Sequence, residues 1–142
     1  MTNILLPVDG SENALRAVHE LVAKRDWFQS PIELHLLNVQ LAIASGLVKS
    51  YISQTQLESY YRDQGLAALA PARAILDHVG MRYQHHIGVG GLAKTILDYA
   101  REKQCDVIIM GTHGRGAMQS ILLGSVASHV VHEAGIPVLL IS

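Results

Sequence analysis

The stretch DVIIMGTHGRGAMQSILLGSVASHVVHEAGIPVLLI, residues 106–141, decides the fold. It opens with a short apolar run over 106–110, which predicts a buried strand, and continues into a loop rich in glycine. Residues 125–134 then have the pattern of a helix closed by Gly135, and 136–141 form a second apolar run. A strand, a helix and a strand in this order predict two strands of one parallel sheet.

The rest of the chain repeats this alternation. Ser11 is a cap for a helix, Gly80 ends a long helical pattern that contains Pro71, and the residues after Gly80 alternate as a half-exposed edge strand does. Strict alternation predicts one α/β domain over residues 1–142, with a parallel sheet and helices on both faces. The further predicted elements are strands over 3–8, 32–39 and 81–87 and helices over 12–25, 56–79 and 92–103.

One segment interrupts the alternation. Residues 41–55, LAIASGLVKSYISQT, connect the second predicted strand to the long helix and are more apolar than a usual connection. A lid or a partner-binding surface is one interpretation. A short extra helix packed on the domain is the other, and we favour it slightly.

Composition excludes several classes of function. The formal net charge is −1 and aromatic residues make up 5%, so neither a basic nucleic-acid surface nor base-stacking platforms are expected. Cys105 is the only cysteine, which excludes a disulfide framework and favours a reducing compartment, the cytoplasm. MTNILLPVDGS has no features of a signal peptide, and no apolar run has the roughly 20 residues of a membrane span.

The glycine loop has the chemistry of a phosphate-binding segment. Gly111 and Gly114 follow a buried strand and would form one side of a crevice, while Gly124 and Ser125 at the start of the last helix would form the other. Free amide groups and the dipole at a helix start favour an anion. Tight turns and a helix cap are the alternative, and spacing alone leaves both interpretations open. No lysine lies in 104–142 and GxGxxG is absent, which excludes a Walker loop and the dinucleotide fingerprint.

Two further residues are expected at the same edge of the sheet. Asp9 follows the first predicted strand and Val39 ends the second. If the first and fourth strands are neighbours, both loops open on one crevice. Asp9 can then hydrogen-bond a base or sugar, and Val39 can form an apolar wall.

These residues carry a family resemblance. The spacing Gly111-x2-Gly114-x9-Gly124-Ser125, the opening ILLPVDGSENA and the strand ending HLLNV resemble the universal stress protein family over nearly the whole chain. The resemblance implies a Rossmann-like domain whose five parallel strands have the order 3-2-1-4-5. It also implies an adenine nucleotide as ligand, ATP or else AMP or ADP. Family members commonly dimerise through the last strand, here residues 137–141.

The resemblance also assigns residues to parts of the nucleotide. It places Pro7, Val8, Asp9 and Val39 on the adenine side, Met110 and Gly111 near the ribose, and His113, Gly114, Gly124, Ser125 and Val126 on the phosphates. Arg115 in the same loop can neutralise phosphate charge. No acidic pair in the loop could hold a metal ion, so Mg²⁺ would rest mainly on phosphates and water.

Three functions remain open at this point. The leading hypothesis is an ATP-binding stress-response homodimer that regulates or signals to an unidentified protein partner. The second is a slow ATPase or self-phosphorylating protein with Ser120 or Ser125 as acceptor, although the loop offers no evident catalytic base. The third is a scaffold that binds no nucleotide. His129 and His132 on one helix lack an evident third metal ligand, and a triad of Ser125, His113 and Asp9 lacks a nucleophile elbow.

Overall fold

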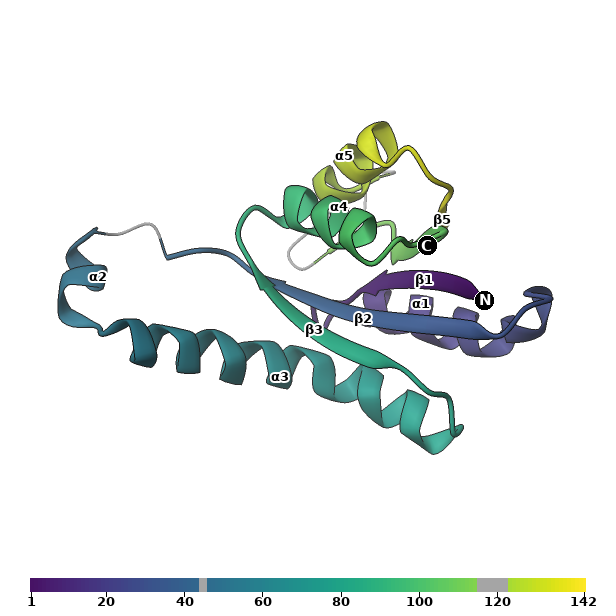
Figure 1. Ribbon diagram of the computed structural model, residues 1–142, viewed down its shortest axis with the longest axis horizontal. Coiled ribbons are helices and arrows are strands. Elements are labelled where there is room, and N and C mark those ends of the chain that lie inside the picture. The colour runs from purple at the N-terminus through teal and green to yellow at the C-terminus, as the bar shows by residue number, and fades with distance from the viewer. Residues whose placement is uncertain (44–45, 115–122) are drawn as a thin grey trace.

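The computed structural model describes residues 1–43, 46–114 and 123–142. Its centre is a five-stranded parallel sheet with the order β3-β2-β1-β4-β5, which confirms the predicted order 3-2-1-4-5 (Figure 1). The first and fourth strands are therefore neighbours, as the crevice hypothesis required. The strands are β1 (Thr2–Pro7), β2 (Ile32–Gln40), β3 (Gln84–Val89), β4 (Val107–Gly111) and β5 (Val138–Ile141).

Helices cover both faces of this sheet, as predicted (Figure 1). One face packs against α1 and α3, and the other against α4 and α5. The α-helices are α1 (Glu12–Ala23), α2 (Gly46–Tyr51), α3 (Gln54–His78), α4 (Leu92–Glu102) and α5 (Ser125–Glu133), and a 3-10 helix spans Arg25–Trp27.

Burial on both faces explains why the central strands read as continuous apolar runs. In β1, Ile4 and Leu6 pack into the core beneath α1 and α3, and Leu5 between them packs into the core beneath α4 and α5. Successive side chains of a strand point to opposite faces, so a strand covered on both sides needs apolar residues at every position.

Side-chain caps set the starts of α1 and α3. The Ser11 hydroxyl accepts a hydrogen bond from the amide of Ala14 (3.2 Å), as its predicted cap role requires. The long helix begins at Gln54 rather than at residue 56 because Ser53 and Gln56 form a reciprocal capping box. It continues through Pro71 and ends before Gly80, which has a φ of +70°.

The third strand begins later than the sequence pattern predicts. Met81 and Tyr83 pack against the core before the strand pairing begins, and β3 starts at Gln84, which lies opposite His35 of β2. Met81 and Tyr83 alternate with polar residues because they pack against the core. These residues do not pair with β2.

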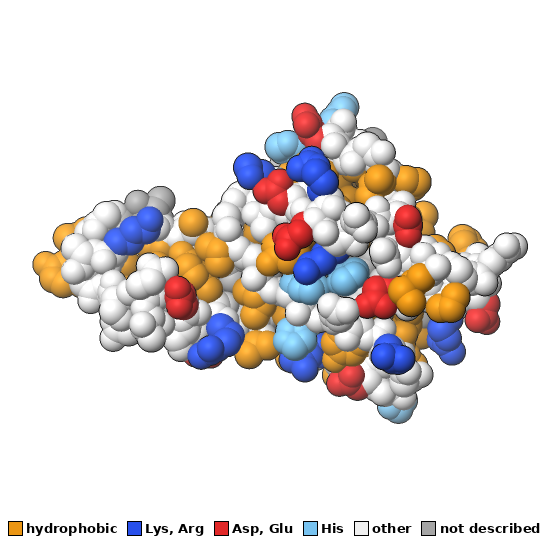
Figure 2. All heavy atoms as spheres, in the orientation of Figure 1, with side chains coloured by type: hydrophobic (Ala, Val, Ile, Leu, Met, Phe, Trp, Pro, Cys, Tyr) orange, Lys and Arg blue, Asp and Glu red, His pale blue; other side chains and the backbone are white. Residues whose placement is uncertain are grey.

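The 41–55 segment contains the short helix that we favoured, but this helix is not packed on the domain. All residues of α2 are exposed, and α2 lies at the far end of the molecule from the sheet (Figure 1). Hydrophobic side chains gather on the surface at this end (Figure 2). Leu47 is 70% exposed and Tyr51 is 81% exposed. Among the described residues, no helix is both long and apolar enough to cross a membrane.

Candidate functional site

A cavity of about 900 Å³ opens at the carboxyl ends of β1, β2 and β4. This is the edge at which parallel α/β sheets bind ligands. The predicted site residues that the structure describes all line it: Pro7, Val8, Asp9, Val39, Met110, Gly111, His113, Gly114, Gly124, Ser125 and Val126. Arg115 lies outside the described residues.

The loop after β1 is held in place by backbone and side-chain hydrogen bonds. The Val8 amide donates to the Leu37 carbonyl (2.8 Å), and the Val8 carbonyl accepts from the Asn38 side chain (2.9 Å). Asp9 Oδ1 accepts from the Ser11 amide (2.9 Å), which forms the turn that starts α1. These bonds fix where the Asp9 carboxylate lies at the cavity.

Asn38 helps to hold this loop and was not among the predicted site residues. Its side chain is buried, and its Oδ1 accepts a hydrogen bond from Gln40 Nε2 (2.7 Å). A buried amide needs partners for its donors and its acceptor. A polar residue inside the apolar run HLLNV was the available signal, because a buried asparagine at a strand end usually satisfies a loop carbonyl.

We call Gly111–Gly114 together with Gly124–Val126 the glycine wall of the cavity. The Thr112 carbonyl accepts from the Gly124 amide (2.7 Å), and the Thr112 amide donates to the Ile141 carbonyl (2.9 Å). The two parts of the glycine wall are therefore bonded to each other and to the end of β5.

Gly124 is a glycine for a reason that spacing did not reveal. A Cβ at this position would lie 3.0 Å from the Thr112 carbonyl oxygen and 3.4 Å from the His113 Cα. A side chain would therefore crowd the backbone of the glycine wall itself. Gly124 also caps α5 without a side-chain hydrogen bond, so no side chain of the cap residue occupies the amides of the first turn.

Gly111 makes room for a residue that the sequence analysis did not consider. Asn13, in the first turn of α1, accepts a hydrogen bond from the His113 amide through its Oδ1 (2.9 Å). A Cβ on Gly111 would overlap that same oxygen. The His113 ring is placed in turn by Thr112, whose Oγ1 lies 2.9 Å from His113 Nδ1. Asn13 thus connects α1 to the glycine wall.

The opposite side of the cavity consists mainly of helix α3. We call it the α3 wall, and its residues are Leu41, Ile43, Tyr60, Gln64, Ala67, Ala68 and Pro71. Leu41 and Ile43 belong to the 41–55 segment, for which a lid or a partner surface was one interpretation; none of the residues on α3 was predicted to be part of a site. The spacing of the α3 residues places them on one face of the helix, but a helical stripe in the sequence does not tell which stripe borders a cavity.

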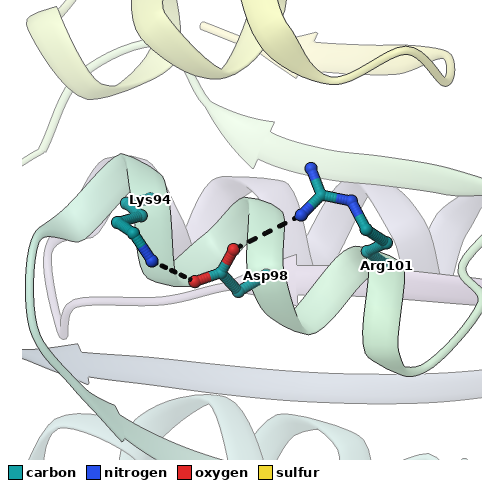
Figure 3. Close-up of polar contacts among 3 residues, drawn as sticks. All are labelled: Lys94, Asp98 and Arg101. Carbon is teal, nitrogen blue, oxygen red and sulfur yellow. Dashed lines mark hydrogen bonds and ion pairs between the residues drawn. The ribbon is translucent and has the colours of Figure 1, made fainter.

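Charged side chains near the cavity are few. Among its described lining residues only Asp9 and His113 can carry a charge at neutral pH, and both lie on the sheet side. The cations of α4 are directed elsewhere (Figure 3): Lys94 Nζ lies 2.7 Å from Asp98 Oδ2, and Arg101 Nη1 lies 3.5 Å from Asp98 Oδ1. The hydrogen bond from Lys94 lowers the pKa of Asp98. The residues of α4 that line the cavity are the apolar Leu92 and Ile96.

A second polar cluster lies away from the cavity, between β2, β3 and α4. His35 Nδ1 and His86 Nε2 are 3.0 Å apart, and the His86 ring contacts Tyr99 at a centroid distance of 5.7 Å. Burial lowers the pKa of both His35 and His86. His85, the neighbour of His86, is exposed, so the two adjacent histidines lie in different surroundings. Within the described ranges no three His, Cys, Asp or Glu side chains are grouped to hold a metal ion.

Comparison with known proteins agrees with this architecture. The model of the universal stress protein family matches residues 1–142. The chain belongs to the universal stress protein family. A universal stress protein of Thermus aquaticus is 32% identical over 138 residues, which cover 97% of this chain and 96% of the relative. The structure of MJ0577 from Methanocaldococcus jannaschii superposes with a TM-score of 0.81 at 28% identity, covering 99% of this chain and 94% of that one.

Three more distant members of the family share the fold and were solved with nucleotides. An Arabidopsis thaliana protein with AMP bound gives a TM-score of 0.69 at 19% identity, covering 99% of this chain and 91% of its own. An Archaeoglobus fulgidus protein in complex with dAMP gives 0.65 at 21% identity, covering 100% and 98%. A universal stress protein in complex with cAMP gives 0.71 at 20% identity, covering 99% and 97%. All three ligands contain adenine.

Proposed function

We propose that this protein, as one universal stress protein domain over residues 1–142, binds an adenine nucleotide in the cavity at the carboxyl edge of its sheet. The observation that carries the proposal is the convergence of four separate chain segments on one cavity. These segments are the loop after β1, the end of β2 and the two parts of the glycine wall. Relatives solved with AMP, dAMP and cAMP support adenine as the common element of the ligand.

The proposed orientation of the nucleotide follows from the groups at the two ends of the cavity, Asp9 and Val39 at one end and the start of α5 at the other. Asp9 and Val39 receive the base or the sugar, one with a carboxylate acceptor and the other with an apolar surface. The first turn of α5, capped by a glycine, receives phosphate through its amides and the Ser125 hydroxyl. ATP, or else ADP or AMP, is the proposed ligand, and Mg²⁺ would be bound mainly by phosphates and water.

The proposed role is regulation of a stress response by a dimer. The hydrogen bond between Thr112 and Ile141 connects the glycine wall to β5, an edge strand with a 40% exposed Leu139. Pairing of residues 137–141 with a second copy would cover this edge. Nucleotide binding at the glycine wall would then alter the surface offered to a protein partner. A cytoplasmic location, which the single cysteine favours, belongs to the same proposal.

Slow hydrolysis or self-phosphorylation is a second candidate. Ser125 lines the cavity at the proposed phosphate end and is exposed. Ser120, the other acceptor that the sequence suggests, lies outside the described residues. Release of phosphate from ATP that disappears in Ser125→Ala would support this candidate.

The test begins with the protein as purified. Mass spectrometry of the denatured protein identifies any bound nucleotide, and calorimetric titration of the emptied protein with ATP and AMP measures affinity. Ser125→Asp places a negative charge at the helix start, where it stabilises the helix but repels phosphate. We expect this variant to lose ATP and AMP and to retain adenosine.

Ser128→Asp is the matched control, because Ser128 lies on the same helix and is not part of the cavity lining. It should bind all three ligands as the unmodified protein does. A wild-type protein that ignores every adenine compound would overturn the proposal and favour a scaffold. Unchanged ATP affinity in Ser125→Asp would refute the placement of the phosphates at α5.

A further inference from the structure

The α3 wall leaves apolar surface uncovered inside the cavity. Tyr60 is 50% exposed and Leu41 is 65% exposed, and Ala67 and Pro71 are also exposed. The opposite side of α3 has fully buried Leu69, Ala72 and Leu76. The helix is therefore anchored by one side and presents the other, mainly apolar side to the cavity.

The reason for this exposure is the length of α3. The helix has 25 residues and runs past the ends of the strands, so that its first half has no strand beneath it (Figure 1). β2 ends at Gln40, and Leu41 and Ile43 then continue along the same side of the cavity. The Ile43 amide donates to the Tyr61 hydroxyl (2.7 Å), which holds this segment against α3. The cavity thus extends from the sheet edge onto a helix surface.

The two walls differ in charge and polarity. Asp9 and His113 both lie on the sheet side, and no described residue of the α3 wall is ionisable at neutral pH. Gln64 gives this wall one neutral amide among apolar groups. Such a surface has no cation for a phosphate and favours burial of a mainly apolar neutral group.

The position of the α3 wall indicates which end of a nucleotide it adjoins. Val39, Gln40 and Leu41 are consecutive, and they lead from the proposed base side directly to the α3 wall. The proposed phosphate end lies at α5, on the other face of the sheet from α3. A group that reaches the α3 wall must therefore be attached at the base end of the ligand.

We propose that the α3 wall is an apolar subsite continuous with the nucleotide site, and that the ligand class of this chain is an adenine nucleotide with a neutral apolar substituent on the base. This inference rests on the proposed function. Aliphatic and aromatic side chains around one neutral amide would bind an alkyl or aryl group, and the cavity volume of about 900 Å³ is large enough for a ligand of drug-like size.

The probe is N6-benzyl-AMP, compared with AMP by calorimetry on the intact protein. Burial of the benzyl group against the α3 wall should tighten binding at least about tenfold. Ala67→Glu introduces a charge into the subsite at an exposed helical position, and should remove this gain, measured as the ratio of the N6-benzyl-AMP and AMP affinities of the same variant. Ala70→Glu is the matched control, since Ala70 is exposed on the same helix and does not line the cavity, and it should keep the gain.

The outcomes separate the inference from the function on which it rests. AMP binding without a gain from the benzyl group, or a gain that persists in Ala67→Glu, would overturn the subsite and leave nucleotide binding intact. A gain lost equally in both glutamate variants would also overturn it, because the effect would then not depend on the cavity. If neither AMP nor its benzyl derivative binds, both the subsite and the proposed function are wrong.

Discussion

The glycine wall and the α3 wall border the same cavity, but different interactions hold them in place. The glycine wall is made of backbone in close contact, where Gly111 and Gly124 each leave room for a neighbouring group, and hydrogen bonds accepted by Asn13 Oδ1 and the Thr112 carbonyl fix it. The α3 wall is the exposed side of a helix that is anchored by its other side. One wall is therefore sensitive to the addition of a single methyl group, whereas the other tolerates larger changes.

The largest effect is expected at Gly111. Gly111→Ala places a methyl group on the Asn13 Oδ1, so either Asn13 loses its hydrogen bond to His113 or the strand end moves. We expect the free energy of unfolding to fall by about 2–4 kcal/mol, from overpacking and a lost hydrogen bond. Urea unfolding followed by circular dichroism measures this loss.

Gly46→Ala is the control for this experiment, because nothing lies within 4 Å of a Cβ at Gly46. It should change stability by less than about 0.5 kcal/mol. The double variant Asn13→Ala with Gly111→Ala should lose less than the sum of the two single variants, since both act on the same oxygen. Additive losses would show that the Asn13 contact is not the reason for the glycine.

The α3 wall should respond to substitution with the opposite sign. Pro71 lies inside α3 and has no amide hydrogen to donate to the carbonyl of Ala67, one turn earlier. Because Pro71 is exposed, alanine fits there and restores the helical hydrogen bond. Pro71→Ala should raise the free energy of unfolding by about 1–3 kcal/mol.

Pro31→Ala tests whether this gain belongs to the helix. Pro31 is exposed just before β2 and lies outside any helix, so its replacement should cost about 0.5 kcal/mol or less through the unfolded chain. A loss of stability in Pro71→Ala would mean that the proline ring makes contacts on the α3 wall that the helix needs.

Acid should loosen the β2–β3 side of the sheet before the β4 side, because the histidine pair joins β2 to β3 away from both walls of the cavity. The hydrogen bond between His35 and His86 requires one ring nitrogen to donate and the other to accept, so protonation of both rings removes it and brings two charges together. The other ionisable groups that face the pair are Glu33, His85, Tyr99, Glu102 and Lys103. Burial keeps the pKa of both histidines below 6.5, so the unfolded chain binds more protons.

The stability from this pair is complete above pH 6.5 and decreases as the pH falls below it. We expect a loss of about 1–2 kcal/mol between pH 7.5 and pH 5, and in His35→Phe a smaller dependence on pH than in the exposed control His78→Gln. Amide exchange at pH 5 should increase in β3 before it increases in β4. Equal opening of both strands would show that the pair does not act on the edge of the sheet.

The contrast between the walls also explains which part of the site the sequence predicts. Asp9 and the first part of the glycine wall lie at or directly after strand ends, and its second part begins the last helix; a parallel sheet brings such positions together whatever the rest of the chain does. The α3 wall depends on how far a helix extends past a strand end, which is a property of tertiary packing. Asn13 was missed for a similar reason, since its contact with His113 joins residues 100 positions apart.

The smallest effect is expected at Tyr60 of the α3 wall. Tyr60 is half exposed and its ring contacts Tyr61 at a centroid distance of 6.0 Å, so Tyr60→Ala should change stability by less than about 0.5 kcal/mol. Tyr83→Ala is the contrasting variant, because Tyr83 packs against the core, accepts from Arg73 and donates to Asp77. It should cost about 2–3 kcal/mol in the same unfolding measurement. A large loss in Tyr60→Ala would mean that the α3 wall is part of the folded core and not a surface available to a ligand.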